Sequence, residues 1–134
     1  MRTTLGDMWE IPATAKVVPT NGVVTAERLA VMGAGVAKQA AMKMPVLPPL
    51  LGGRISRFGN RVFAFRLTPE EGQRVNAVYI ITFPTKHDWK DDSSLDLIEK
   101  SVWQLAELSK SMGFGTIVMP EVGMGLGNLH PKLV

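Results

Sequence analysis

The segment AVYIITF, residues 77–83, is a continuous apolar run, which is typical of a β-strand covered on both faces. Downstream of it, Ser93 or Ser94 can cap a helix over residues 95–112, whose apolar side chains repeat along one face. Glycines then end this helix, and residues 116–119 form a second apolar run that predicts another strand. A strand, a helix and a strand in this order indicate an α/β layered domain.

The segments upstream of this unit continue the alternation of strand and helix. Residues 16–20 predict a short buried strand, and residues 35–44 predict a helix with a small-residue face that ends at Pro45. Residues 45–53 are rich in Pro and Leu and are expected to be irregular, whereas the alternation over residues 61–67 predicts a strand. In layered α/β sheets, ligands bind beyond the carboxyl ends of the strands, so the loops that follow the strands are the candidate site.

Composition narrows the classes of function. A chain of 134 residues is expected to form one domain, and its net charge of +3 is a small excess rather than a basic stripe. Cysteine is absent, which excludes disulfides, cysteine-ligated zinc and thiol catalysis and favours a cytoplasmic location. Two histidines argue against a histidine-rich metal site, and neither a signal region nor a run of membrane-spanning length is found. We therefore expect no metal and no membrane partner.

Two glycine-rich segments carry the main signal for a ligand. One is PEVGMGLGN, residues 120–128, with glycines at every second position directly after a predicted strand, and the other places Gly33 and Gly35 before a helix. Glycine lets the backbone approach a ligand closely, and free N–H groups at a loop or a helix N-terminus suit phosphate. Both segments could also be ordinary turns. Neither is a P-loop, because no Gly-Lys-Ser/Thr follows. Together they predict a diphosphate, and so a nucleotide-like ligand.

Five polar or aromatic side chains lie at the predicted strand ends, and each has two readings. Asn21 before a glycine is either a turn residue or an amide that binds ribose hydroxyls. Lys86 is either a solvated charge or a nucleophile or base facing a phosphosugar, and His87 is either a surface residue or an acid–base group. Trp89 either stacks on a base or covers the core, which is the default. Asp7 either binds an adenine amine or caps a turn.

In their order along the chain, these motifs resemble the macrodomain family, the ADP-ribose-binding α/β/α module. Within it, the chain is similar to the branch of the DarG antitoxin and the human terminal ADP-ribose glycohydrolase, over residues 5 to about 131. The resemblance implies a three-layer α/β/α fold with a mixed central sheet, as one macrodomain over residues 1–134. Macrodomains usually continue through another helix and strand beyond the position of Val134, so we expect either a truncated C-terminus or a domain in which this last edge is dispensable. The motifs that carry the resemblance are Gly6-Asp7, Thr20-Asn21-Gly22, MGAGVA at residues 32–37, FPTK at 83–86 and the loop at 120–128.

The resemblance also implies roles for individual residues. Asp7, next to Gly6, would contact the adenine, and Asn21 would lie beside the distal ribose. Lys86, which follows Thr85 in the matched FPTK motif, corresponds to the family lysine that attacks the anomeric carbon C1 of ADP-ribosyl adducts. The residues that would wrap the diphosphate and distal ribose are Gly33, Ala34, Gly35 and Val36 in the first loop, with Val122, Gly123, Met124, Gly125, Leu126, Gly127 and Asn128 in the second.

Two departures from the family pattern bear on the substrate. Glycohydrolases that act on acidic side chains carry an aspartate near the position of Gly127, so its absence brings this chain closer to the DNA-directed members. The insertion at residues 23–30 separates Asn21 from Gly33 more widely than in DarG.

The expected function is binding of ADP-ribose and hydrolysis of ADP-ribosyl adducts on DNA or protein, without a cofactor. The candidate catalytic residues are Lys86, Asn21 and His87, and the expected partner is ADP-ribose or an ADP-ribosylated macromolecule. The alternatives are a non-catalytic ADP-ribose-binding module and an ADP-ribose-1″-phosphate phosphatase assisted by His87.

Overall fold

The computed structural model describes residues 8–120, and within that range four strands form one mixed sheet. The strands are β1 (Ala15–Thr20), β2 (Phe63–Arg66), β3 (Tyr79–Pro84) and β4 (Ile117–Val118), in the spatial order β2-β3-β1-β4. Strand β1 pairs in parallel with both β3 and β4, and β2 pairs antiparallel with β3. The apolar segment at residues 77–83 therefore supplies a central strand, as its sequence predicts.

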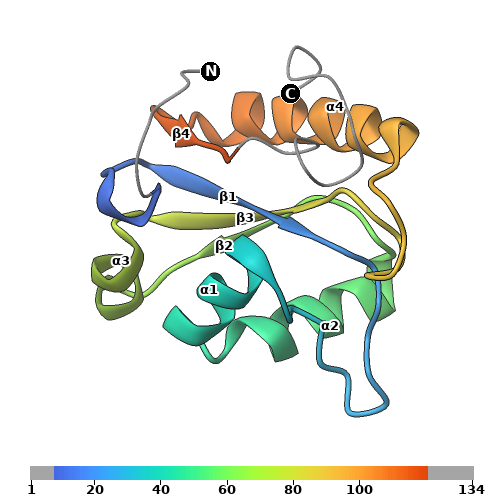
Figure 1. The fold of residues 1–134 in the computed structure, drawn as a ribbon. Helices are drawn as coiled ribbons and strands as arrows, with labels where there is room; N and C mark the ends of the chain where they lie inside the picture. The colour runs from blue at the N-terminus through green and yellow to red at the C-terminus, as the bar shows by residue number, and fades with distance from the viewer. Residues whose placement is uncertain (1–7, 121–134) are drawn as a thin grey trace.

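Helices cover both faces of this sheet (Figure 1). On one face lie α1 (Gly35–Lys43), α2 (Leu47–Phe58) and α3 (Pro69–Val75), and on the other lies α4 (Leu95–Met112). A short 3-10 turn, η1 (Met8–Glu10), precedes β1. The three-layer α/β/α arrangement with a mixed sheet is confirmed. In residues 8–120, no helix is long and apolar enough to span a membrane.

Side-chain caps explain where two of these helices begin and end. In α4, the hydroxyl of Ser94, not that of Ser93, accepts a hydrogen bond from the Leu97 amide at 3.3 Å, and Gly113 ends the helix with φ of 66°. In α3, Thr68 and Glu71 form a reciprocal capping box. The chain therefore enters α3 within a few residues of the end of β2.

The helix α2 corrects the expectation that residues 45–53 are irregular. Proline favours chain breaks, but Pro48 lies in the first turn of α2, where its missing N–H costs no helical hydrogen bond. Leu47 and Leu51 are almost completely buried against the sheet, and this burial holds the helix in place. The prediction was wrong because the apolar spacing of residues 47 and 51 outweighs the proline signal.

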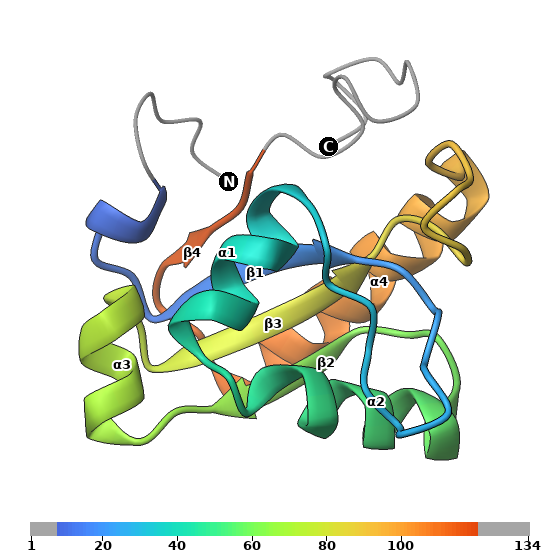
Figure 2. The ribbon, with the colours of Figure 1, turned by 60° about the horizontal axis from the view of Figure 1, so that its bottom comes forward.

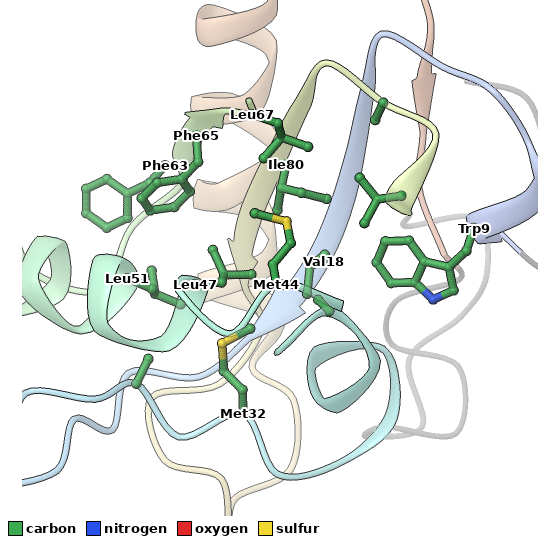
Figure 3. Packing of buried hydrophobic residues seen from close by; sticks show 14 residues of the cluster. Trp9, Val18, Met32, Met44, Leu47, Leu51, Phe63, Phe65, Leu67 and Ile80 are labelled. Carbon is green, nitrogen blue, oxygen red and sulfur yellow. The ribbon is translucent and has the colours of Figure 1, made fainter. Parts of the chain in front are cut away.

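Two apolar cores fill the spaces between the layers. The larger lies between the sheet and helices α1–α3 and includes Met32, Met44, Leu47 and Ile80 (Figure 3). The smaller lies under α4 and centres on strand residues such as Phe83. Met32 belongs to the segment that enters α1, so the core anchors the backbone just before the first glycine-rich loop.

Two adjacent glycines of α2 give a matched test of this packing. A Cβ at Gly52 would overlap the carbonyl of Arg28 and approach the Ala30 nitrogen to 2.9 Å, whereas a Cβ at Gly53 meets no described atom within 4 Å. We expect Gly52→Ala to lower the free energy of unfolding by about 2–3 kcal/mol. Gly53→Ala, which improves helix propensity, should raise it by about 0.5–1 kcal/mol. Urea denaturation measures both, and equal effects of the two substitutions would contradict the close contact.

Candidate functional site

The site begins with the parallel pairing of β1 and β3. Thr20 pairs with Pro84 at the ends of the strands, and the Thr85 amide donates to the Thr20 carbonyl at 3.0 Å. Since parallel strands end at the same edge, the residues that follow them, Asn21 and Lys86, are brought together. In Figure 2 the chain that enters α1 passes beside this edge of the sheet.

A cavity of about 500 Å³ lies at this edge, within the size range of small-molecule sites. Its described lining includes no carboxylate, and Lys86 is its charged residue, so the walls favour an anionic ligand. Residues 8–120 contain no cluster of three or more His, Cys, Asp or Glu that could hold a metal. The lining residues are Pro19, Thr20, Asn21, Val31, Met32, Gly33, Ala34, Gly35, Val36, Ala37, Thr85, Lys86 and Trp89.

The N-terminus of α1 forms one wall of the cavity. Ala34 is its extended N-cap residue and offers no side-chain cap, and the first turn carries no acid. Gly35 has φ of 57°, a left-handed conformation that glycine adopts at low cost. The amides of the first turn therefore have neither a side-chain acceptor nor a compensating carboxylate, and together with the helix dipole they can bind an anion.

Asn21 is held as a turn residue. Its Oδ1 accepts from the Val23 amide at 2.9 Å, and its Nδ2 donates to the Val31 carbonyl at 3.0 Å. The turn reading is confirmed, and the amide ties the start of the 23–30 insertion to its end. A side-chain amide has a second N–H and a second acceptor lone pair, so the ribose role stays compatible with these two bonds.

The side chains of Lys86 and His87 lie in different surroundings although the two residues are adjacent in the chain. Lys86 is half-buried and lines the cavity, whereas His87 is exposed and is not among the lining residues. Asn60 lies beside both: its Nδ2 donates to the Lys86 carbonyl at 3.0 Å and lies 3.3 Å from the Nδ1 of His87. The Gly22 amide donates to the His87 carbonyl at 3.1 Å. Asn60 and Gly22 thus fix the turn that presents Lys86.

The sequence alone did not single out Asn60. No local signal marks it, because its partners are 26 and 27 residues away along the chain. A role of this kind becomes visible only when the loop after α2 and the turn after β3 are seen to meet.

Trp89 does not cover the core, and the default reading of this side chain was wrong. It is 56% exposed and lines the cavity, with the Nζ of Lys90 at 6.0 Å from its ring centroid. The turn at residues 86–88 carries the side chain away from the sheet, so its ring is available for stacking on a ligand.

The structure brings a subset of the expected ligand residues to one cavity. Gly33, Ala34, Gly35, Val36 and Thr85 all line it, together with Asn21 and Lys86. Gly6, Asp7 and the second loop, Val122, Gly123, Met124, Gly125, Leu126, Gly127 and Asn128, lie outside the described residues.

An α/β/α fold with a helix N-terminus at the carboxyl ends of two parallel strands is an arrangement typical of domains that bind nucleotide-like ligands. The macro domain family model matches residues 59–134, more than half of the chain, and the chain belongs to that family.

Known relatives agree with this assignment. A DNA ADP-ribosyl glycohydrolase of Mycobacterium tuberculosis is 27% identical over 107 residues, which cover 80% of this chain and 30% of that protein. The chain thus spans less than a third of the length of this curated relative. The macrodomain of Mycobacterium tuberculosis DarG has a TM-score of 0.80 at 25% identity, with 97% of this chain and 81% of that chain covered. Thermosipho africanus DarTG in complex with ADP-ribose has the same fold, with a TM-score of 0.77 at 23% identity, covering 92% of this chain and 33% of that one.

The contact between Gly22 and Asn60 predicts coupled effects of mutation. A Cβ at Gly22 would lie 2.8 Å from the Cγ of Asn60 and 3.0 Å from the His87 carbonyl oxygen. We expect Gly22→Ala to lower the free energy of unfolding by about 1–2 kcal/mol through overpacking. Asn60→Ala should cost about 1 kcal/mol through the lost hydrogen bond to Lys86.

The double variant should cost less than the sum, because Asn60→Ala removes the two nearest atoms that the new methyl group meets and, of the three nearest, leaves only the His87 carbonyl oxygen. Urea denaturation of the four proteins measures this coupling. Strict additivity would show that the two turns do not constrain each other.

Proposed function

We propose that this domain binds ADP-ribose in the cavity and hydrolyses ADP-ribosyl adducts of DNA, with Lys86 as the nucleophile. The observation that carries the proposal is that Lys86 and the uncapped N-terminus of α1 line the same cavity. The first supplies an amine and the second supplies amides for a diphosphate, which are the groups that an ADP-ribosyl hydrolase of this kind needs.

The wider likeness supports the choice of ligand and substrate. The macrodomain fold is shared with the structure of Thermosipho africanus DarTG in complex with ADP-ribose. The matched relative from Mycobacterium tuberculosis is a DNA ADP-ribosyl glycohydrolase. Trp89, exposed at the cavity, offers a ring face to a base, which suits a nucleic-acid adduct.

The chemistry follows from the position of Lys86. The amine of Lys86 forms a C–N bond to C1 of the distal ribose as the bond from C1 to the DNA base breaks, and the proton that the nitrogen loses passes to the departing base. Water then hydrolyses the lysine adduct, which releases ADP-ribose and regenerates the amine. The amides of the first turn of α1 hold the diphosphate, so the sugar stays in place through both steps.

The alternatives receive different support. A binding module without turnover needs the same cavity and differs only in the role of Lys86. The phosphatase alternative depends on His87, which is exposed and outside the cavity lining, so no described contact favours it.

Gly33 gives a test of the binding site that leaves the fold intact. A Cβ at Gly33 meets no described atom within 4 Å, and its φ is not in the left-handed region. We expect Gly33→Val to retain the stability of the wild type, because nothing must move. The branched side chain should occupy ligand space and weaken ADP-ribose binding by at least about tenfold, or about 1.4 kcal/mol. Calorimetric titration measures the affinity, and unchanged binding would remove this loop from the site.

Lys86 is tested by two substitutions that differ in charge. Lys86→Ala removes both the amine and its charge, whereas Lys86→Arg keeps the charge but supplies no nucleophile at neutral pH. We expect both to lower kcat for release of ADP-ribose from an ADP-ribosylated oligodeoxynucleotide by about 100-fold or more. ADP-ribose binding by Lys86→Arg should stay close to that of the wild type.

Each outcome has a definite meaning. Full activity in Lys86→Arg would contradict the role of Lys86 as a nucleophile and would indicate that its charge alone is needed. Tight ADP-ribose binding by the wild type without release of ADP-ribose from the oligodeoxynucleotide would contradict the hydrolase function and favour the non-catalytic binding module.

A further inference from the structure

The charges of this chain are segregated along the sequence. Between Glu27 and Glu70 lie seven of the fifteen lysines and arginines and none of the twelve acids. This stretch contributes α1 and α2, which form the same helical layer. A net charge of +3 for the whole chain therefore hides a positive surface on α1 and α2, whereas α3 in the same layer carries Glu70 and Glu71. The expectation of no basic stripe applies only to the average over the chain.

Two exposed aromatic rings lie at the border of this layer. Phe58, the last residue of α2, is 55% exposed, and Trp89 at the cavity is 56% exposed. Each ring has a neighbouring cation: Arg57 lies 5.2 Å from the Phe58 ring centroid and Lys90 lies 6.0 Å from that of Trp89. Exposed rings beside cations are the pattern that binds single-stranded nucleic acid, because bases stack on the rings and phosphates pair with the charges.

The two rings are joined through the loop that follows α2. Asn60 donates to the Lys86 carbonyl at 3.0 Å, so the segment from Phe58 to Arg61 meets the turn that leads to Trp89. In Figure 1 the chain that follows α2 passes near the loop after β3, in agreement with this hydrogen bond. The residues at the C-terminal end of α2 and the turn from Lys86 to Trp89 thus lie next to each other, joined at Asn60, and together form the surface considered below.

Acidic residues border this surface along residues 88–96. Asp88 lies in the turn between Lys86 and Trp89, where its carboxylate accepts a hydrogen bond from the Lys90 amide at 3.0 Å. Asp91 and Asp92 follow Lys90 on the way to α4, and Asp96 lies in the first turn of that helix. They repel phosphates, so a strand that leaves the cavity is directed toward α2 rather than toward α4.

We propose that a single DNA strand, joined to the ADP-ribosyl group in the cavity, runs over the C-terminal end of α2. Phe58 stacks on a base of this strand, and Arg57 and Arg61 contact its phosphates. This inference rests on the proposed function and names the surface through which the domain recognises the DNA part of its substrate. An acidic protein would need the charges but not the stacking ring, so the ring decides between the two partners.

The experiment measures binding of an unmodified single-stranded oligodeoxynucleotide by fluorescence anisotropy, which requires neither ADP-ribose nor turnover. We expect the double variant Arg57→Glu, Arg61→Glu to lower the affinity by about tenfold or more, and to reduce the slope of log affinity against log salt by about 1.4. The control is Lys110→Glu, which makes the same change of charge per site at an exposed position of α4, on the opposite face of the sheet. It should leave both the affinity and the salt slope unchanged. An equal loss in Lys110→Glu would overturn the proposal, as would the absence of binding by the wild type.

The ring is tested by a pair of conservative changes. Phe58→Tyr keeps a stacking face and should retain the affinity of the wild type, whereas Phe58→Leu keeps apolar volume and should lose about tenfold. Equal binding by these two variants, or equal binding of an acidic peptide to the wild type, would overturn stacking as the basis of recognition.

Failure of the surface and failure of the function can be told apart. The arginine variants should bind free ADP-ribose as the wild type does, because none of these residues lines the cavity. On an ADP-ribosylated oligodeoxynucleotide, they should raise KM while kcat stays unchanged. Oligodeoxynucleotide binding without ADP-ribose binding would contradict the proposed function. It would also contradict this inference, because the ADP-ribosyl end of the substrate would then have no place in the cavity. ADP-ribose binding with no effect at Arg57, Phe58 or Arg61 would overturn the surface alone.

Discussion

The parallel pairing of β1 with β3 is the constraint on which the site depends. Its register places Thr20 opposite Pro84, and the hydrogen bond from the Thr85 amide to the Thr20 carbonyl continues the pairing beyond the strand ends. Below these ends, the buried hydroxyl of Ser101 on α4 donates to the Pro84 carbonyl at 2.8 Å. The edge of the sheet is thus tied to the opposite helical layer, and Lys86 is presented from a rigid base. The proposed role as a nucleophile needs such a base, because small errors in the position of the attacking atom cost much of the rate.

The second wall of the cavity is positioned by packing rather than by pairing. The insertion at residues 23–30 contains Arg28 in a left-handed conformation with φ of 63°, which is unfavourable for a residue with a Cβ. Its backbone lies directly against Gly52 of α2, and the Ala30 amide donates to the Pro48 carbonyl at 3.0 Å. The helix therefore holds the strained turn, and the chain leaves it through buried Met32 into Gly33. The insertion and α2 together aim the N-terminus of α1 at the cavity.

These contacts also explain which parts of the molecule could be predicted from the sequence. The strands and α4 follow local rules: apolar runs, a serine cap and a terminal glycine act within a few residues. The glycine loop at residues 33–35 and Lys86 follow from strand ends, which the order of elements locates. The helix α2 was missed because its prolines outweighed, in the prediction, the apolar spacing of residues 47 and 51. The roles of Trp89 and Asn60 could not be obtained from local rules. They depend on contacts between distant segments, such as that of Asn60 with Lys86, and no pattern within one segment encodes such a contact.

The uneven distribution of charge along the chain could have been predicted from the sequence, but the net charge of the whole chain conceals it. A run without acids from Arg28 to Pro69 has no consequence for the fold, since the buried residues of α1 and α2 are apolar or small. Its effect is on the partner. Inside the cavity, Lys86 is the charged residue of the described lining, and backbone amides are available for the remaining anionic groups. Outside it, side-chain cations provide a field that extends about 8–10 Å at physiological salt, which attracts a polyanion without fixing its sequence. In the proposed complex, backbone amides select the modification and side chains hold the DNA strand, so the two kinds of recognition could change independently of each other.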